Sequence, residues 1–365
     1  MKSIKSRTTI GDLAAFLGVT KSTVSRALND YPDISETTRL RVRKAASAMS
    51  YRPLSHAQAI KTGRVRSIGL VLQVSEHDGH RPFLADFLAG ITQAASEQDW
   101  TLTIATAANV DDAVRLLNKL SEERKADGFI LPRTYVNDLR IKALREQLIP
   151  FVLYGRTADI AECSWFDIAG EDAMVDAVER LYNLGHRRIA FLPGGEGYNY
   201  SVLRHEGYKV GLEKVGIEYD DRLVGNNAVN QEQGRRAADL LLHSRVPPTA
   251  IICSVDLAAL GAYEAIEHAG LAVGKDISII SYDGIPEGAI VTPSLSTFAV
   301  NTRHAGERLT DLLIRRIRGE AAQELRELAQ ADFLDRQSHG PRTRTSKELA
   351  QLLETKSNYR EENDE

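Results

Sequence analysis

Lys21, Ser22 and Arg26 carry the polar groups best placed for directional contacts near the N-terminus, within the stretch "TKSTVSRALN". A helix that starts at Lys21 turns these three side chains away from the apolar Val24 and Ala27. Lysine and arginine donate to the acceptors of guanine in the major groove of DNA, and serine bonds to several base edges. The pattern therefore indicates a surface that reads double-stranded DNA. Small polar side chains nearby suit contacts to phosphate oxygens, which position a protein on DNA: Thr20, Thr23, Ser25, Asn29, Ser35 and Thr38.

A second group of polar residues follows apolar segments in the middle of the chain. Asp283 follows "ISIISY", Asp256 follows "TAIICS", and Arg204 begins a helical stretch after "AFLPGG". Ligands of open α/β sheets bind at the carboxyl ends of the strands. A carboxylate accepts hydrogen bonds from neighbouring hydroxyls and an arginine donates them, so this set suits a polyol. Asp256 fits equally well as the N-cap of the helix that follows it.

The sequence lacks the local signatures of common enzymes, namely GxSxG, GxxxxGK and HExxH. The stretch "GGEGYNY", residues 194–200, lacks the last glycine of the dinucleotide-binding motif. The two cysteines, Cys163 and Cys253, have no CxxC spacing, which disfavours a disulfide scaffold or a zinc site and suits a reducing cytoplasm. No apolar run reaches the roughly 18 residues of a membrane helix. We therefore expect a cytoplasmic protein that is not an enzyme and needs no cofactor, metal or membrane.

Three short helices must position the basic residues near the N-terminus. Ile10, Leu13, Ala14 and Leu17 recur at the spacing of one helix face. Gly18 suits the end of this helix, while Thr20 and Ser35 suit the N-caps of the next two. Two helices joined by a tight turn, with a third behind them, describe a helix-turn-helix. The inward positions of the second and third helices are Val24, Ala27, Leu28, Val42, Ala45, Ala46 and Met49.

Charge is divided unevenly between this N-terminal part and the rest of the chain. Residues 1–66 hold 13 Lys and Arg against 4 Asp and Glu, a net charge of +9, and the remaining residues carry −13. A basic head on an acidic body is typical of a protein that contacts nucleic acid. A solvated basic face and a helical corner of an enzyme core are the alternatives.

From Ser67 onward, short apolar runs alternate with amphipathic helical stretches. This alternation predicts a doubly wound α/β architecture, in which helices cover both faces of a parallel sheet. The pattern leaves open whether the body holds one sheet or two. The expected strands lie in 67–74, 101–106, 127–132, 150–154, 187–194, 249–254 and 277–282, and the expected helices in 84–98, 110–124, 170–184, 201–215, 231–243 and 256–270.

Several stretches resemble the LacI/GalR family of bacterial transcription regulators. "TIGDLAAFLGVTKSTVSRALN", "DISETTRLRV" and "MSYRP" match its DNA-binding head, and "LGHRRIAFLPG", "PPTAIICSVDLAALGAYEAI" and "ISIISYDGIP" match its effector-binding body. The resemblance implies an all-α helix-turn-helix domain (1–53), a hinge helix and linker (54–66), and a two-lobed body similar to periplasmic binding proteins (67–341). The body then has two doubly wound parallel sheets and binds an effector between its lobes. The expected lobes cover about 67–168 with 300–327, and about 169–299 with 328–341.

The hinge helix of this family orders on DNA and inserts an apolar side chain into the minor groove. Ile60 matches the inserting position, where the family usually has leucine, and Ala57 is the other hinge residue expected at the minor groove. This chain also has Leu54 where family members commonly have asparagine after the proline. The resemblance therefore implies a hinge helix but does not specify the operator sequence that this hinge prefers.

Arg204 and Asp283 match effector-binding positions of the family. Phe83 and Trp165 suit the apolar face of a sugar ring. Many family members have Asp-Asn where this chain has Ala169-Gly170, so the resemblance does not specify which sugar is bound. The other candidates for the effector site are Arg133, Asp167 and Asp256; Arg133, Trp165 and Asp167 fit equally well as residues packed where the chain crosses between lobes.

The end of the chain, residues 342–365, is rich in charged residues. Its one apolar patch consists of Leu349, Leu352 and Leu353, which is too short for a coiled coil. We therefore expect a polar, mostly disordered tail without a tetramerising zipper.

The resemblance implies a transcription regulator that acts as a homodimer on a pseudo-palindromic operator. The favoured interpretation is a repressor that a sugar effector releases from DNA. Details such as "PFLADFLAGI" and "GFILPRT" resemble a subgroup of the family associated with α-glucoside use, the AglR type. The alternatives are a regulator that a non-sugar corepressor tightens on DNA and a transport-type sugar-binding protein.

Overall fold

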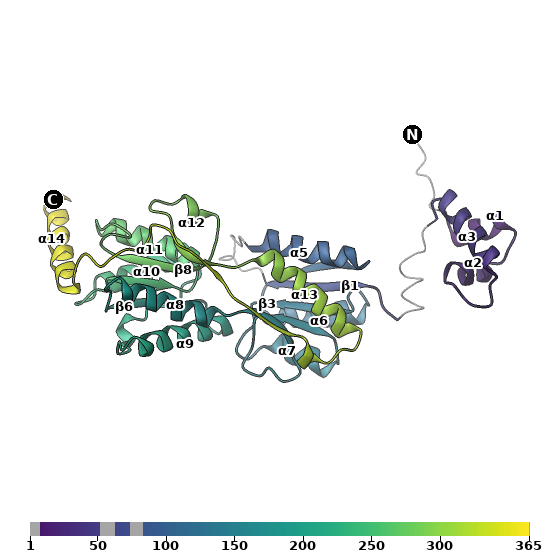
Figure 1. Ribbon diagram of the computed structural model, residues 1–365, viewed down its shortest axis with the longest axis horizontal. Coiled ribbons are helices and arrows are strands. Elements are labelled where there is room, and N and C mark those ends of the chain that lie inside the picture. The colour runs from purple at the N-terminus through teal and green to yellow at the C-terminus, as the bar shows by residue number, and fades with distance from the viewer. Residues whose placement is uncertain (1–7, 52–62, 74–82, 365) are drawn as a thin grey trace. The chain divides into compact units, whose positions relative to one another are not determined.

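A computed structural model describes residues 8–51, 63–73 and 83–364, with the side chains of residues 83 and 357–364 outside the description. The chain divides into two compact units, Met1–Val65 and Arg66–Glu365 (Figure 1). We call the first unit the head and the second the body. No helix in the described part of the chain is long and apolar enough to cross a membrane.

The head contains three helices, α1 (Ile10–Leu17), α2 (Lys21–Leu28) and α3 (Glu36–Ala48). Gly18 ends α1 in the left-handed conformation, with φ of 66°. The Thr20 hydroxyl accepts a hydrogen bond from the backbone N–H of Thr23, and Ser35 caps α3 in the same way through Thr38. These caps satisfy N–H groups that have no partner inside their helix. The predicted helix-turn-helix is therefore confirmed.

The core of the head is small and lies between the three helices. Leu13, Val24 and Ala27 are fully buried, and Val42 is 1% exposed. Every predicted inward residue belongs to this cluster, because the spacing of apolar residues along each short helix leaves only one face that can pack. Around the buried centre lie Ile10, Leu17, Val19, Leu28, Ile34, Met49 and Tyr51.

The first lobe of the body is built on a sheet of six strands, all paired in parallel. Helices α5 (Phe83–Glu97) and α13 (Thr302–Ile317) cover one face, while α6 (Val110–Glu122) and α7 (Leu139–Glu146) cover the other. Both faces are therefore buried, which explains the continuously apolar strands. In spatial order the strands are β10 (Arg326–Ala329), β5 (Ser164–Ile168), β4 (Phe151–Tyr154), β3 (Gly128–Pro132), β1 (Ser67–Gln73) and β2 (Thr101–Ala107).

The second lobe is built on a five-stranded sheet that is parallel except for its edge strand, which pairs antiparallel with its neighbour. Helices α10 (Gln231–Leu242) and α11 (Asp256–His268) cover one face, and α8 (Gly170–Asn183) and α9 (Asn199–Lys214) cover the other. Figure 1 shows helices on both sides of each sheet. The strands in order are β11 (Asp332–Leu334), β9 (Ser296–Ala299), β8 (Ser278–Asp283), β7 (Ala250–Cys253) and β6 (Ile189–Leu192).

The expected fold class is confirmed, because the body has two doubly wound sheets. The chain passes between the sheets after β5, after β9 and after β10. The last passage lies at residues 330–331, beyond the expected 327–328, because β10 stays paired with β5 through Ala329.

The predicted disordered tail is wrong, because residues 346–364 form helix α14 (Ser346–Asp364). Thr345 and Glu348 cap the helix reciprocally: the Thr345 N–H donates to the Glu348 carboxylate at 2.7 Å, and the Glu348 N–H donates to the Thr345 hydroxyl at 3.3 Å. Leu349 is fully buried in a core cluster of the second lobe, and Leu352 and Leu353 pack beside it. Three leucines are too few to form a coiled coil. They are enough to hold α14 against the second lobe, because they pack onto a core that the lobe already provides.

Candidate functional site

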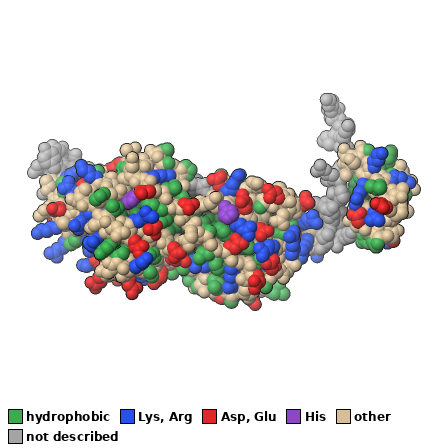
Figure 2. All heavy atoms as spheres, in the orientation of Figure 1, with side chains coloured by type: hydrophobic (Ala, Val, Ile, Leu, Met, Phe, Trp, Pro, Cys, Tyr) green, Lys and Arg blue, Asp and Glu red, His purple; other side chains and the backbone are tan. Residues whose placement is uncertain are grey.

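The outward face of α2 presents the residues predicted to read bases. Lys21, Ser22 and Arg26 are exposed, whereas Val24 and Ala27 on the opposite face are fully buried. Figure 2 shows Lys and Arg side chains on the visible face of the head, with a small group of acidic side chains among them. The structure thus brings the three predicted residues together on one accessible helix face.

Arg26 has partners that the sequence analysis did not identify. Its Nη2 lies 2.5 Å from the Asp33 carboxylate, and its guanidinium carbon lies 5.3 Å from the centre of the Tyr31 ring. The Arg26 and Asp33 side chains are each 46% exposed, so water screens this ion pair. To donate to a base, Arg26 must exchange these contacts for DNA.

The six residues predicted to contact phosphate already form hydrogen bonds within the head. The hydroxyls of Thr20 and Thr23 lie 2.9 Å apart, and those of Ser35 and Thr38 lie 2.8 Å apart, at the starts of α2 and α3. Helix starts of this kind favour phosphate oxygens. Ser25 and Asn29 differ, because they lie in the second half and at the C-cap of α2, where the Asn29 amide donates to the Ser25 carbonyl at 2.6 Å. Ala57 and Ile60, predicted to enter the minor groove, lie outside the described residues.

A cavity of about 380 Å³ lies between the two lobes of the body, within the size range of small-molecule sites. It is found at the carboxyl ends of β3, β4, β5 and β8, as the rule for open α/β sheets requires. Four predicted residues line it: Arg133, Asp167, Arg204 and Asp283. The sequence analysis missed other charged and aromatic residues of its wall, namely Asp86, Arg156, Glu171, Tyr154, Tyr198, Tyr200 and Tyr282.

Arg204 on α9 enters the cavity with one donor still unused. Its Nη1 donates to the Ser254 carbonyl at 2.5 Å, and its guanidinium carbon lies 3.7 Å from the centre of the Tyr282 ring. Its Nε is buried and has no hydrogen-bond partner among the described residues. A Cβ on Gly170 would lie 2.9 Å from this Nε. The glycine that departs from the Asp-Asn of the family therefore makes room for Arg204.

Asp283 ends β8 with φ of 131°, a conformation that residues other than glycine rarely adopt. Such strain clusters at functional sites. Burial raises the pKa of its carboxyl to about 7, and the nearby Arg204 guanidinium opposes the rise. The ionisation of Asp283 therefore changes with pH near neutrality, and its ionised form accepts hydrogen bonds on both oxygens.

Asp256 is fully buried and does not line the cavity. One carboxylate oxygen accepts hydrogen bonds from the N–H groups of Gly284 and Ile285 at 2.8 and 2.9 Å, and the other accepts one from Thr297 at 2.7 Å. Both predictions for Asp256 are wrong: it does not face the effector cavity, and the N-cap of α11 is Val255. Its carboxylate instead fixes the loop that follows Asp283.

Trp165 does not line the cavity either, so its prediction as a sugar platform is wrong. It is the second residue of β5, near the amino end of the strand, and it packs against the core cluster that includes α6 and α7. Asp167, two residues further along, does reach the cavity. Phe83 begins α5, but its side chain lies outside the described residues.

Arg156 joins the two lobes through an ion-pair network. Its Nε lies 2.6 Å from Asp167 in the first lobe, and its Nη2 lies 2.6 Å from Glu171 in the second. The second oxygen of Glu171 is buried without a partner among the described residues. Among the described residues, no three His, Cys, Asp or Glu side chains gather as a metal site requires.

Two family models match the chain. The model of bacterial regulatory proteins, lacI family, matches residues 9–54, and that of the periplasmic binding protein-like domain matches residues 178–339. The chain is 36% identical over 335 residues to the HTH-type transcriptional regulator AglR of Rhizobium meliloti (strain 1021), a match that covers 90% of this chain and 93% of that protein.

Further similarity extends over most of the chain. It is 30% identical over 315 residues to the HTH-type transcriptional regulator RafR of Escherichia coli, covering 86% of this chain and 93% of that one. Among solved structures, the complex of the transcriptional regulator CelR with cellobiose superposes with a TM-score of 0.71 at 27% identity, covering 91% of this chain and 100% of the other. The similarity thus includes both the head and the body.

Proposed function

The chain belongs to the LacI family of bacterial regulatory proteins, and we propose that its head binds a pseudo-palindromic operator while a sugar in the cleft controls that binding. The protein is a regulator rather than an enzyme. Two copies place their α2 helices in successive major grooves, as helix-turn-helix dimers do. The α2 face with Lys21, Ser22 and Arg26 makes the base contacts.

The chemistry of the cavity supports an uncharged polyol as the effector. Its charged lining consists of Asp86, Asp167, Glu171 and Asp283 against Arg133, Arg156 and Arg204, so the two signs nearly balance. A balanced site favours a neutral ligand over a phosphorylated or strongly anionic one. Tyrosine rings in the wall suit the apolar faces of sugar rings.

The observation that carries the proposal is a pair of buried groups on α8 and α9 of the second lobe, neither of which has a hydrogen-bond partner among the described residues. Arg204 Nε offers a donor and the second Glu171 oxygen offers an acceptor, both buried. A buried polar group without a partner costs free energy, so a ligand that supplies both hydrogen bonds is favoured. A sugar hydroxyl supplies either kind.

Effector binding acts on the operator through the arrangement of the lobes. A sugar that fits the closed cleft holds the lobes together, and the changed arrangement separates the hinges of the dimer. By linkage, the operator weakens sugar binding by the same factor by which the sugar weakens operator binding. α-Glucosides are the first class to test, because the chain resembles the AglR subgroup.

The test is fluorescence anisotropy of a labelled duplex from the promoter of the protein's own gene, at fixed salt. Protein is titrated first, followed by sucrose, trehalose or maltose, with cellobiose as the β-linked comparison. Saturable binding that an α-glucoside reverses supports the proposal. Tightening by the sugar would establish a corepressor, and binding that ignores all four sugars would reject the sugar assignment.

A further inference from the structure

Two loops meet across the cleft and join the lobes directly. Residues 134–136 follow β3 in the first lobe, and residues 197–199 lead into α9 of the second, which begins at Asn199. The Val136 N–H donates to the Gly197 carbonyl at 3.0 Å, and the Asn199 N–H donates to the Thr134 carbonyl at 3.0 Å. Tyr135 and Tyr198 pair between these bonds as an antiparallel bridge. The backbone itself therefore closes the cleft at this point.

Side chains stack in a column through the same contact. The rings of Tyr135 and Tyr198 lie 4.7 Å apart at 21°, and those of Tyr198 and Tyr200 lie 5.6 Å apart at 23°. Arg140 lies 5.4 Å from the ring centre of Tyr135 at one end, and Arg204 lies 4.7 Å from that of Tyr200 at the other. We call these five side chains the column. Stacked rings and cations over ring faces attract one another, so the members of the column stabilise each other's positions.

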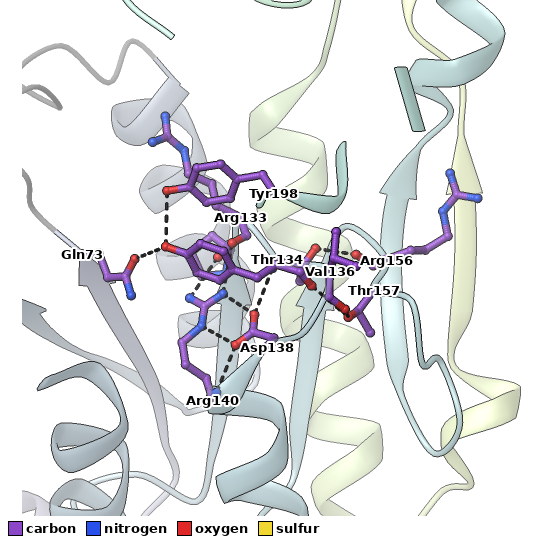
Figure 3. A network of polar contacts seen from close by, with 11 residues as sticks. Gln73, Arg133, Thr134, Val136, Asp138, Arg140, Arg156, Thr157 and Tyr198 are labelled. Carbon is purple, nitrogen blue, oxygen red and sulfur yellow. Dashed lines mark hydrogen bonds and ion pairs between the residues drawn. The ribbon is translucent and has the colours of Figure 1, made fainter. Parts of the chain in front are cut away.

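The first-lobe end of the column is rigidly anchored. The side chains of Arg140 and Asp138 are 3% and 0% exposed and form an ion pair at 2.7 Å. The Tyr135 hydroxyl donates to the Gln73 side chain at 2.7 Å, and the Tyr135 N–H donates to the Asp138 carboxylate at 3.2 Å. Figure 3 shows Gln73, Asp138 and Arg140 gathered around this loop. Contacts to Gln73, Asp138 and Arg140 therefore fix Tyr135 to the first lobe.

The glycines of "GGEGYNY" let the second-lobe rings take their places. A Cβ on Gly194 would lie 2.4 Å from the Tyr200 ring, and a Cβ on Gly195 would lie 2.6 Å from the Tyr198 ring. Both rings therefore lie against bare backbone. The stretch that falls short of a dinucleotide-binding motif serves instead to build the column.

We propose that Tyr135 is a positioning residue of the effector site, a role that rests on the proposed function. Tyr198, Tyr200 and Arg204 line the cavity, whereas Tyr135 lies behind them and does not. Tyr135 holds Tyr198 from the opposite lobe, and Tyr198 in turn supports Tyr200 and the guanidinium of Arg204. The column therefore ties the placement of Arg204 to the closure of the lobes.

Hydrogen exchange on the full-length protein without sugar tests the column directly. Tyr135→Leu removes the ring, and the control Tyr135→Phe keeps the ring but loses the hydroxyl contacts to Gln73 and Tyr198. We expect the Asn199 amide, on the far side of the cleft, to exchange about two- to tenfold faster in the leucine variant than in the phenylalanine variant. The amides of β3 report whether the first lobe remains folded. If the β3 amides also exchange faster in Tyr135→Leu, a second variant tests the column from the other lobe. Gly195→Ala displaces the Tyr198 ring and is expected to speed exchange of the Val136 amide.

Calorimetric titration of the same variants with sucrose, trehalose, maltose and cellobiose tests the consequence for the effector. Tyr135→Leu is expected to weaken the sugar that wild type binds by about two- to tenfold, and Tyr135→Phe by less than twofold. Unchanged exchange at Asn199, or a leucine variant with the affinity of wild type, would overturn the proposal. If the wild-type protein binds none of the four sugars, the sugar assignment is rejected instead. Hydrogen exchange at the Asn199 amide then decides by itself whether Tyr135 holds the lobes together.

Discussion

The head and the cleft use charged side chains in opposite ways. In the head, Arg26 and Asp33 pair in the open, each 46% exposed. In the cleft, Arg156, Asp167 and Glu171 are 15–26% exposed, and Asp256, which holds the loop after Asp283 without lining the cavity, is fully buried. Exposed pairs are worth about 0–1 kcal/mol, whereas breaking a buried network costs several times more. The head therefore exchanges its partners for DNA at little cost, while the cleft holds a fixed geometry against which a ligand is selected.

The largest effect that this contrast predicts is at Asp256. Asp256→Ala leaves three donors unpartnered, the N–H groups of Gly284 and Ile285 and the hydroxyl of Thr297. The free energy of unfolding of the body should fall by about 3 kcal/mol or more, measured by denaturant titration with tryptophan fluorescence. Asp111→Ala, an exposed residue in the first turn of α6, should change it by less than about 0.5 kcal/mol. Equal effects of the two substitutions would contradict the structural role of Asp256.

The next effect concerns base reading by the head. Arg26→Ala should cost about 1–3 kcal/mol of specific operator affinity and relax the preference at one base pair, because a bidentate contact to guanine is lost. Anisotropy with a set of single-base operator variants measures both. Lys44→Ala, an exposed basic residue of α3, is the control and should leave base preference intact. An Arg26 variant with unchanged preference at every position would remove Arg26 from the reading surface.

Sugar affinity should depend on pH through Asp283. Burial and the negative charge of Asp256 raise the pKa of its carboxyl, whereas the positive charges of Arg204 and Arg133 lower it. The resulting pKa is about 7. About one-tenth of the molecules carry the carboxylate at pH 6 and about nine-tenths at pH 8, so affinity should rise about tenfold over this range. Isothermal titration at the two pH values measures the change, and Asp283→Asn should flatten it. A wild type whose affinity is the same at both values would show that the carboxylate does not bind the sugar.

The same shift has a consequence for stability. The folded body holds this proton more tightly than the unfolded chain, since the folded pKa of Asp283 is about 7 against a usual value near 3.8. The contribution of this group to stability is therefore full below about pH 4, and it is lost as pH rises toward 7.

The smallest effect is expected at Asp33. Asp33→Asn releases Arg26 from its ion pair and should raise operator affinity by no more than about fivefold, as a screened surface pair implies. Asp30→Asn is the matched control, because it removes the same charge but frees Arg43 instead. If both variants raise affinity equally and leave base preference alone, the effect is one of net charge and Arg26 is not restrained by Asp33.

The head could be predicted almost residue by residue, because each helix is specified by its own caps and apolar spacing. Gly18, Thr20 and Ser35 act locally, and the sequence carries the whole signal. In the body, the alternation of apolar runs predicted seven of the strands and six of the helices, but neither α7 nor α13. It missed β5, β9, β10 and β11, which are three to five residues long and are defined mainly by the neighbours with which they pair.

The cleft was predicted less completely, because its residues come together only in the fold. The strand ends pointed correctly to Asp283. The burial of Asp256 depends on Thr297 and on the loop at Gly284, which lie 41 and 28 residues away along the chain. Tyr135 and Tyr198 are 63 residues apart and carry no spacing signal. The pairing of Arg156 with Asp167 and Glu171, in different lobes, likewise appears only in the folded structure.

Arg204→Ala tests most directly the central claim that ligand binding in the cleft controls the head. Anisotropy of the labelled operator is measured for wild type and variant, first without sugar and then with the sugar that releases wild type. The variant should bind the operator with wild-type affinity and stay bound as the sugar is added, because Arg204 lines the cavity proposed to hold the ligand and lies in the body, away from α2. A variant that the sugar releases at the same concentration as wild type would contradict the assignment of the effector site.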